Sequence, residues 1–229
     1  MIRFIAGLLL AGAPALLMAG AISIVPLRVE LGKARTASLT ITNENVSRTF
    51  EVRVTEWSQD NGVDSYAPTD ELLAVPSTFR LDQGASQVIR VTLNIKPDTT
   101  EHAYRVFLNE IVPAPEVAAG SVVTTALSVG IPAFVLPQGG RPPKGKLDVK
   151  AEKTPTGIRI VAQNGGVANL KAEEITVESS GTPLIRVTPG DYVLSDAART
   201  WEYPLRQAAG GPLTVSIRTD RGTFSASTR

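Results

Sequence analysis

The chain of 229 residues contains no cysteine and a single histidine, His102. Without cysteine it can form neither a disulfide nor a thiolate site, and one histidine does not supply the usual ligands of a zinc centre. A Cys/His nucleophile is excluded and a Ser-His-Asp triad is unsupported. His102 follows Glu101, and we interpret it as an exposed side chain rather than a catalyst. Stability must therefore come from buried apolar surface.

An excess of one charge is also lacking. The formal net charge is +1, and removing Arg3 leaves 22 basic and 22 acidic side chains. This balance excludes the basic surface typical of nucleic-acid binding or of attraction to anionic membranes. The sequence has no glycine-rich phosphate motif, and "QDNGVD" lacks the spacing of a calcium-binding loop. We therefore expect no enzymatic activity, no cofactor and no metal.

The one long apolar run lies at the amino terminus. In "MIRFIAGLLLAGAPALLMAGA" a cation, Arg3, precedes the run, and Ala19 and Ala21 form an A-x-A arrangement. This pattern predicts a secretory signal over residues 1–21 that is cleaved before Ile22. A membrane anchor is the alternative, but the run is short and is interrupted by glycine and proline. We expect an exported protein that is not inserted in the membrane.

Period-two alternation of apolar and polar residues dominates the first half of the remaining chain, and turn signals such as "NENVS" and "LDQG" separate the alternating segments. No stretch of ten or more residues keeps a helical period with proper caps. The pattern predicts an all-β domain, an antiparallel sandwich. The predicted strands include residues 37–43, 50–57, 86–95 and 104–112.

A change of composition divides the chain. The segment "PQGGRPPKGK", residues 137–146, is rich in glycine, proline and lysine and has no apolar period. Strand patterns then resume as far as "GTFSAS". We predict a first β domain over residues 22–138, a linker over 139–146 and a second β-sandwich over 147–229.

One strand is unusual. "TTALSVGIPAFVLP", residues 124–137, carries no charge, is long for a strand and stops at a proline. At the edge of a sheet such a run is an aggregation hazard unless something covers it. Periodicity alone leaves two readings open, an ordinary strand buried on both faces or an edge strand that awaits a partner.

Several motifs of the first domain resemble one family, the periplasmic pilus chaperones of the PapD-like type. "PSTFRLDQGASQVIRVTL" is similar to the family pattern P-x-x-x-R-L-x-x-G-x-x-Q-x-x-R-V, and "EHAYRVFLNEI" to its next strand. "ISIVPLRVELGKARTASLTITN" resembles the amino-terminal segment. The resemblance implies two immunoglobulin-like β-sandwich domains in tandem. It also implies that the last strand of the first domain is lent to a pilus subunit that lacks one.

In such a complex, backbone hydrogen bonds and alternate apolar side chains of the lent strand fill the subunit's groove. The larger side chains of this strand occupy odd positions. The resemblance therefore implies that the groove receives one face of the strand, made of Val123, Thr125, Leu127, Val129 and Ile131.

The family anchors the subunit's terminal carboxylate with an arginine and a lysine. Arg28, in "PLRVEL", matches the arginine, with an exposed strand cation as the alternative. Pro132 stands where the lysine is expected, a departure typical of the archaic branch of the family. Arg90, in "VIRV", is a candidate for the second charge, or else a structural arginine paired with a carboxylate.

Two carboxylates, Glu101 and Asp220, align with an interdomain ion-pair network, although both are equally well explained as surface charges. The arginine that bridges them in the family is replaced by Leu136. We therefore expect the domain orientation to depend less on that network.

These resemblances imply a periplasmic chaperone that binds, folds and caps pilus subunits until an outer-membrane usher takes them. The alternative is a structural pilus subunit or an adhesive β-sandwich protein. A subunit would carry a donor extension of alternating apolar residues before its first domain, whereas "ISIVPLRVEL" leads almost directly into the sandwich.

Overall fold

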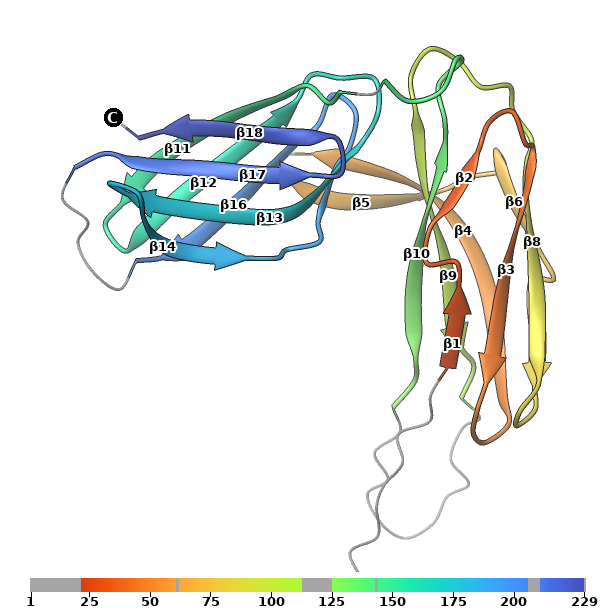
Figure 1. The fold of residues 1–229 in the computed structure, drawn as a ribbon. Coiled ribbons are helices and arrows are strands. Elements are labelled where there is room, and N and C mark those ends of the chain that lie inside the picture. Colours follow the sequence, from red (N-terminus) through yellow and green to blue (C-terminus); the bar gives the residue numbers. More distant parts are fainter. Residues whose placement is uncertain (1–21, 61, 113–124, 143, 206–210, 229) are drawn as a thin grey trace, which may run out of the picture.

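The structure of the protein, a computed structural model, describes residues 22–228 except for 61, 113–124, 143 and 206–210. Within these residues there is no helix, and the strands form two β-sandwich domains (Figure 1). The predicted all-β fold class is therefore confirmed. The strands predicted over residues 37–43, 50–57, 86–95 and 104–112 correspond to β3, β4, β8 and β9.

The first domain packs a four-stranded sheet in the order β1-β3-β8-β6 against a sheet in the order β2-β10-β9-β4-β5, in which β7 also pairs with β4. Its strands are β1 Ile22–Val25, β2 Val29–Leu31, β3 Thr36–Asn43, β4 Arg48–Asp60, β5 Val63–Pro68, β6 Leu72–Val75, β7 Thr78–Leu81, β8 Ser86–Leu93, β9 His102–Glu110 and β10 Ser128–Val135.

The second domain packs a sheet in the order β11-β12-β16 against one in the order β14-β13-β17-β18, with β15 paired to the start of β13. No strand is assigned between Val135 and Leu147 in the described part of this interval, which includes the predicted linker. The strands of the second domain are β11 Leu147–Thr154, β12 Gly157–Asn164, β13 Leu170–Ser179, β14 Thr182–Val187, β15 Tyr192–Val193, β16 Ala198–Pro204, β17 Leu213–Thr219 and β18 Gly222–Ser227.

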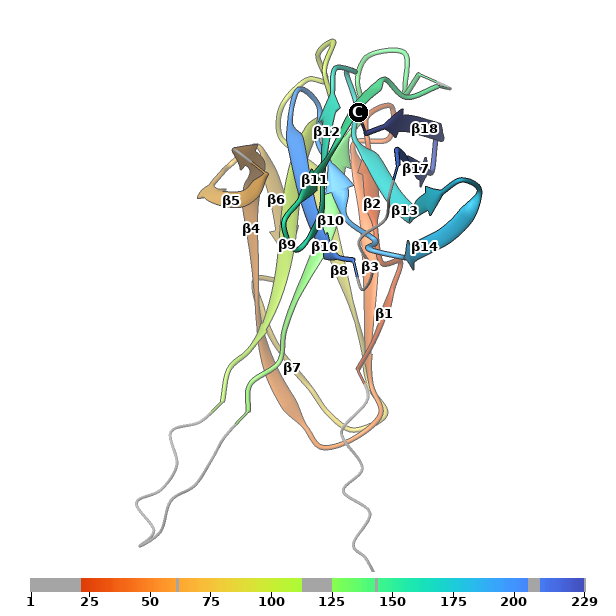
Figure 2. The same cartoon turned by 90° about the vertical axis from the view of Figure 1, so that its left-hand side faces the viewer.

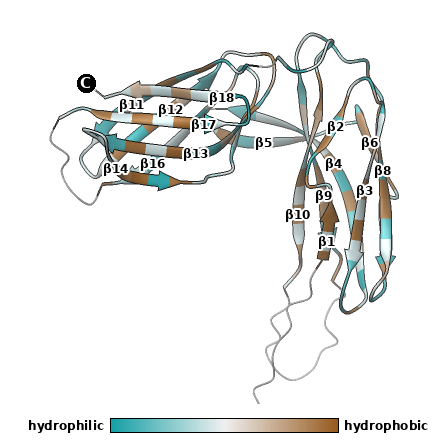
Figure 3. Ribbon diagram, viewed as in Figure 1, coloured by the Kyte–Doolittle hydropathy of each residue, from teal (hydrophilic) through white to brown (hydrophobic). Residues whose placement is uncertain are grey.

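Alternation along the strands builds one core in each domain. Because successive side chains point to opposite faces, the apolar positions of β3, β8 and β9 fall between the two sheets. Figure 3 shows the resulting change between hydrophobic and hydrophilic residues along single strands. A separate third cluster lies at the domain junction and contains Trp57, Phe134, Tyr192, Leu194 and Ala197.

The two domains meet at an angle, so the molecule is bent (Figure 1), and a second view shows the second domain across one end of the first (Figure 2). In the junction cluster the Trp57 ring lies 6.0 Å from Phe134 and 5.7 Å from Tyr192, measured between ring centroids. These aromatic contacts join β4 and β10 of the first domain to β15 of the second.

Candidate functional site

The first domain has an open edge at β10. This strand pairs with β9 over Ser128–Val135, but on its other side β2 pairs only with Ala133, Phe134 and Val135. Among the described residues, the stretch from Ser128 to Pro132 therefore has no neighbouring strand on that side. An unpaired stretch of this kind is a template for pairing with another chain.

A second free edge, β1, lies at the same side of the sandwich. The chain forms β1 at the edge of the four-stranded sheet and three residues later forms β2 beside β10 in the other sheet. Ile22 and Ile24 of β1 are only partly buried against the core, as are Leu127 and Val129 at the start of the β10 segment. The seam between the two sheets is thus lined with incompletely covered apolar side chains.

The structure places the predicted lent-strand residues in three different environments. Thr125 is exposed, Leu127 and Val129 are partly buried, and Ile131 is 2% exposed within the core of its own domain. Val123 lies outside the described residues. The odd positions thus point toward the core of this domain, and their burial increases along the strand from Thr125 to Ile131. That these residues fill the groove of a partner stays a prediction.

Side chains of the neighbouring strand hold the start of β10. The Leu127 backbone N–H donates to Glu110 Oε2 at 3.0 Å, and the same oxygen lies 2.8 Å from Arg48 Nη1. The Ser128 hydroxyl donates to Asn109 Oδ1 at 2.7 Å. These contacts keep the segment in line with β9 while its outer edge stays unpaired.

Arg28 lies between β1 and β2, at the domain junction. Its Nε is 2.8 Å from Glu30 Oε1, and its Nη1 is 3.7 Å from Asp220 Oδ2 of the second domain. The guanidinium carbon lies 4.8 Å from the centroid of the Phe134 ring and 5.5 Å from that of Tyr192. With a side chain 23% exposed, Arg28 is a half-buried junction residue and not a simple surface cation.

Arg90 is not brought near Arg28. It is exposed on β8, in the other sheet of the first domain, where its cross-strand partners are Ser38 and Val75. Arg28 and Arg90, the two candidate anchors, therefore do not lie together. The "VIRV" motif that contains Arg90 belongs to the other sheet of the first domain.

Arg105 lies on the strand next to the position where the lysine is expected. Pro132 of β10 is the direct cross-strand partner of Arg105 on β9. The Arg105 guanidinium carbon is 3.9 Å from the Trp57 ring centroid, and its Nη1 donates to Gly130 O at 3.1 Å. Its buried Nε has no hydrogen-bond partner among the described residues. Sequence reasoning missed this residue because only the register of β9 against β10 reveals it.

An interdomain network does form around Glu101. Glu101, whose side chain is 2% exposed, accepts a hydrogen bond from Arg141 Nε at 2.7 Å and another from the Asn169 backbone N–H at 3.0 Å. Arg141 also pairs with Glu30. The bridging cation is thus supplied by the linker segment, five residues beyond Leu136.

Asp220, the other carboxylate of the predicted network, also lies at the junction. Its Oδ1 accepts the Lys171 backbone N–H at 2.9 Å, and its Oδ2 faces Arg28. Nearby, burial lowers the pKa of Arg221, whose guanidinium contacts the Ala168 carbonyl at 2.8 Å. The network therefore joins the first domain, the linker and the second domain.

We expect Glu101→Gln to weaken the docking of the two domains. The amide keeps one acceptor for Asn169 but loses the charge that holds Arg141, which should cost about 1.5–3 kcal/mol. Thermal unfolding followed by calorimetry should show a lower or a split transition. Glu202→Gln, in an exposed pair with Arg159, is the control and should change stability little. Equal effects of the two variants would show that the Glu101 contacts do not stabilise the junction.

The described residues lack a cluster that could hold a metal ion. No group of three or more potential metal ligands occurs among them. His102 Nε2 lies 3.0 Å from Asp98 Oδ2. The hydrogen bond from the Thr100 backbone N–H, and to a smaller extent the one with His102, lowers the pKa of Asp98. In the part of the chain that the structure describes, no helix is long and apolar enough to cross a membrane.

The fold and these edges define a class of protein, two-domain β-sandwiches with a free edge strand beside a basic junction. The family model described as "Pili and flagellar-assembly chaperone, PapD N-terminal domain" matches residues 21–141, more than half of the chain. The protein therefore belongs to this family of pilus-assembly chaperones, which confirms the family predicted from the sequence motifs.

Solved structures share the fold across both domains. The chaperone–tip subunit complex CsuC–CsuE, from the archaic Csu pili of Acinetobacter baumannii, matches with a TM-score of 0.64 at 16% identity, covering 91% of this chain and 98% of that chain. The E. coli chaperone DraB matches with a TM-score of 0.57 at 21% identity, covering 92% and 97%.

The complex of the SafB chaperone with the SafA pilin from Salmonella enterica matches with a TM-score of 0.58 at 18% identity, covering 90% of this chain and 95% of that chain. At these identities the structural matches show the fold alone. No curated protein matches the sequence.

Proposed function

We propose that this chaperone binds pilus subunits by lending them the free edge of β10 and the segment that precedes it. The single observation that carries the proposal is the unpaired stretch from Ser128 to Pro132, which lies beside incompletely covered apolar side chains. A subunit strand paired there would gain backbone hydrogen bonds and would cover that seam.

In this proposal the side chains that enter the subunit's groove are Leu127 and Val129, together with Thr125 and the predicted Val123. Leu127 and Val129 are already half covered by the chaperone's own core. The core of the chaperone would therefore continue into that of the subunit along one face of the strand. From Ile131 onward the side chains of the strand are buried within the chaperone itself.

The terminal carboxylate of the subunit is proposed to bind at the domain junction between Arg28 and Arg105. Asp220 is 3.7 Å from Arg28, beyond hydrogen-bond distance, so an incoming carboxylate could engage Nη1 of Arg28 without displacing a short ion pair. Arg105 contributes a second guanidinium at the position opposite Pro132. Hydrogen bonds between guanidinium and carboxylate groups are among the stronger ones in proteins.

Arg105→Ala is expected to weaken subunit binding about tenfold or more, because a positioned charge–charge contact is worth about 1.4 kcal/mol or more. Arg90→Ala is the matched control, since it removes an exposed arginine from the other sheet. Isothermal titration with a purified, co-exported pilus subunit measures both. If Arg90→Ala weakens binding and Arg105→Ala does not, the anchor pair named here is wrong.

The proposal also includes export of the chaperone to the periplasm and transfer of the bound subunit to an usher. The leader over residues 1–21 would direct the chain to the periplasm, where an outer-membrane usher would receive the subunit. No nucleotide is required, because one edge strand replaces another by exchange. Supporting this, the chain belongs to a family of periplasmic chaperones.

Purification of the exported protein together with a pilus subunit tests the whole proposal. A chaperone should yield a stable complex with one copy of each protein, and the subunit should remain monomeric within it. Polymerisation of this chain by itself would instead identify it as a structural pilus subunit. Size-exclusion chromatography with light scattering separates the two outcomes.

A further inference from the structure

A hairpin of the first domain reaches across to the second. The 13-residue strand β4 pairs with β9 only as far as Glu56, opposite Tyr104. Beyond that point β4 continues with β5 alone, as a ribbon in which Asp60 pairs with Val63. Figure 1 shows this ribbon leaving the first domain and running along the second. An isolated two-stranded ribbon is only marginally stable, so its position depends on other contacts.

The tip of the ribbon rests on the backbone of β16. Gly62 has φ +82°, a left-handed conformation that favours glycine. A Cβ atom at Gly62 would lie 3.4 Å from the backbone nitrogen of Thr200 and 3.8 Å from the Ala198 carbonyl oxygen. Glycine therefore serves both the turn of the hairpin and its close approach to the second domain.

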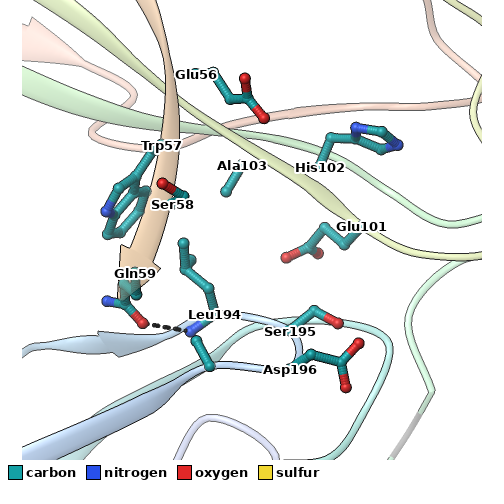
Figure 4. A pocket seen from close by; sticks show the side chains of 11 residues that line it. Glu56, Trp57, Ser58, Gln59, Glu101, His102, Ala103, Leu194, Ser195 and Asp196 are labelled. Atoms are coloured by element: carbon teal, nitrogen blue, oxygen red, sulfur yellow. Dashed lines mark hydrogen bonds between the residues drawn. The ribbon is translucent and has the colours of Figure 1, made fainter. Parts of the chain in front are cut away.

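Gln59 makes a two-sided contact with β15 and the residue that follows it. Its Nε2 donates to the Tyr192 carbonyl at 2.9 Å, and its Oε1 accepts the Leu194 backbone N–H at 2.9 Å. Figure 4 shows the second of these bonds at the rim of a cavity of about 210 Å³ between the domains. The side-chain amide thus takes the place of a neighbouring peptide group.

An ion-pair chain lies beside this contact. Asp64 Oδ1 accepts from Gln59 Nε2 at 2.9 Å and lies 3.0 Å from Arg199 Nη1 of the second domain. Arg199 in turn pairs with Asp191 at 3.2 Å, and Asp191 accepts the Trp201 indole N–H at 2.8 Å. The side chains of Gln59, Asp64, Arg199 and Asp191 thus form one continuous series of polar contacts that links β4 to β16.

Tyr192 connects this hairpin to Arg28, at the proposed carboxylate site. Its carbonyl is held by Gln59, and its ring lies 5.4 Å from the Phe134 ring, measured between centroids. The Arg28 guanidinium sits over both rings. A shift of the second domain that moves Tyr192 would therefore remove one of the surfaces that position Arg28.

We propose that the β4–β5 hairpin is a clamp that fixes the angle between the domains, and that Gln59 and Asp64 are positioning residues for the carboxylate site at Arg28. The inference rests on the proposed function in one respect, namely that this site receives the subunit's terminal carboxylate. Neither residue needs to touch the subunit. When only part of a population is binding-competent, the apparent affinity falls by that fraction.

The angle can be measured without any subunit. Because the chain has no cysteine, Ser38→Cys and Lys150→Cys provide one exposed spin-label site in each domain. Double electron–electron resonance then reports the distribution of interdomain distances. Gln59→Ala and Asp64→Asn are compared with Gln87→Ala, a control in the other sheet of the first domain whose amide donates to the neighbouring Val88 carbonyl.

We expect a narrow distance distribution for the parent protein and for Gln87→Ala, and a broadened one for Gln59→Ala and Asp64→Asn. Subunit affinity should fall about tenfold in the broadened variants, as for a binding-competent fraction of about one tenth. Circular dichroism should show that each variant keeps its β content.

Unchanged distributions in both Gln59→Ala and Asp64→Asn would overturn the clamp, whatever the fate of subunit binding. Broadened distributions with unchanged affinity would overturn the positioning role. If the parent protein binds no subunit at all, the proposed function fails, and the distance distributions still decide the clamp.

Discussion

Leu127→Asp is expected to abolish stable binding of a pilus subunit. In the proposed complex Leu127 fills an apolar groove, and an unpaired carboxylate there should cost about 4 kcal/mol or more, roughly a thousandfold in Kd. The chaperone itself should still fold. Leu127 is only partly buried against its own core, so the substitution should cost less than about 2 kcal/mol of stability.

Co-purification and titration with the subunit measure the first effect, and thermal unfolding of the free chaperone measures the second. Ala126→Asp is the matched control, because Ala126 is exposed and occupies the alternate face of the same segment. Normal binding by Leu127→Asp, or an equal loss in Ala126→Asp, would show that the face of the strand has been assigned wrongly.

Arg28→Ala is expected to lower subunit affinity by about 2–5 kcal/mol, because it leaves a carboxylate at a half-buried junction without its partner. Arg28→Lys should restore only part of the loss, since lysine lacks the two-pronged geometry of a guanidinium. The pairing with Glu30 and the 3.7 Å approach to Asp220 add a structural effect. These partly exposed pairs should contribute about 1 kcal/mol or less to stability.

Titration with the subunit separates these effects when the melting curves of the free variants are recorded beside it. Arg80→Ala is a suitable control, since Arg80 pairs with Asp82 on the surface and is 70% exposed. An Arg28→Ala protein that unfolds would make Arg28 structural. One that binds subunits normally would move the anchor to another cation, Arg105 first.

Much of the fold follows from alternation in the sequence. The strands β3, β4, β8 and β9 are each half buried, so their period of two is visible without any tertiary information. β5 was not predicted, because all but one of its six residues are exposed and its pattern shows no apolar face. It exists as a strand because β4 pairs with it along the whole ribbon.

The site depends on register, which the sequence does not reveal. The alternation of side chains along β10 is visible in the sequence, but the degree of burial is not, since Ile131 lies in the core of its own domain whereas Leu127 and Val129 are only partly buried. Arg105 becomes a candidate only when Pro132 is known to lie opposite it. Arg90 was chosen for its motif, yet it belongs to the other sheet.

The linker shows a similar limit. A segment rich in glycine and proline, such as "PQGGRPPKGK", predicts a connection between domains. Its one arginine, Arg141, nevertheless reaches the buried Glu101 and replaces the bridging cation that is missing at Leu136. The contact with Glu101 is thus made from a sequence position other than 136.

Hydrogen exchange in a chaperone–subunit complex tests the central claim most directly, because it reports which backbone amides become protected. We predict that binding slows exchange in β1 and in the segment from Thr125 to Ile131, which lie on either side of the open seam of the first domain. The exchange rates of the amides in β8 and in the strands of the second domain far from the junction should be unchanged. Protection confined to the second domain, with β1 and β10 exchanging as in the free protein, would contradict the account.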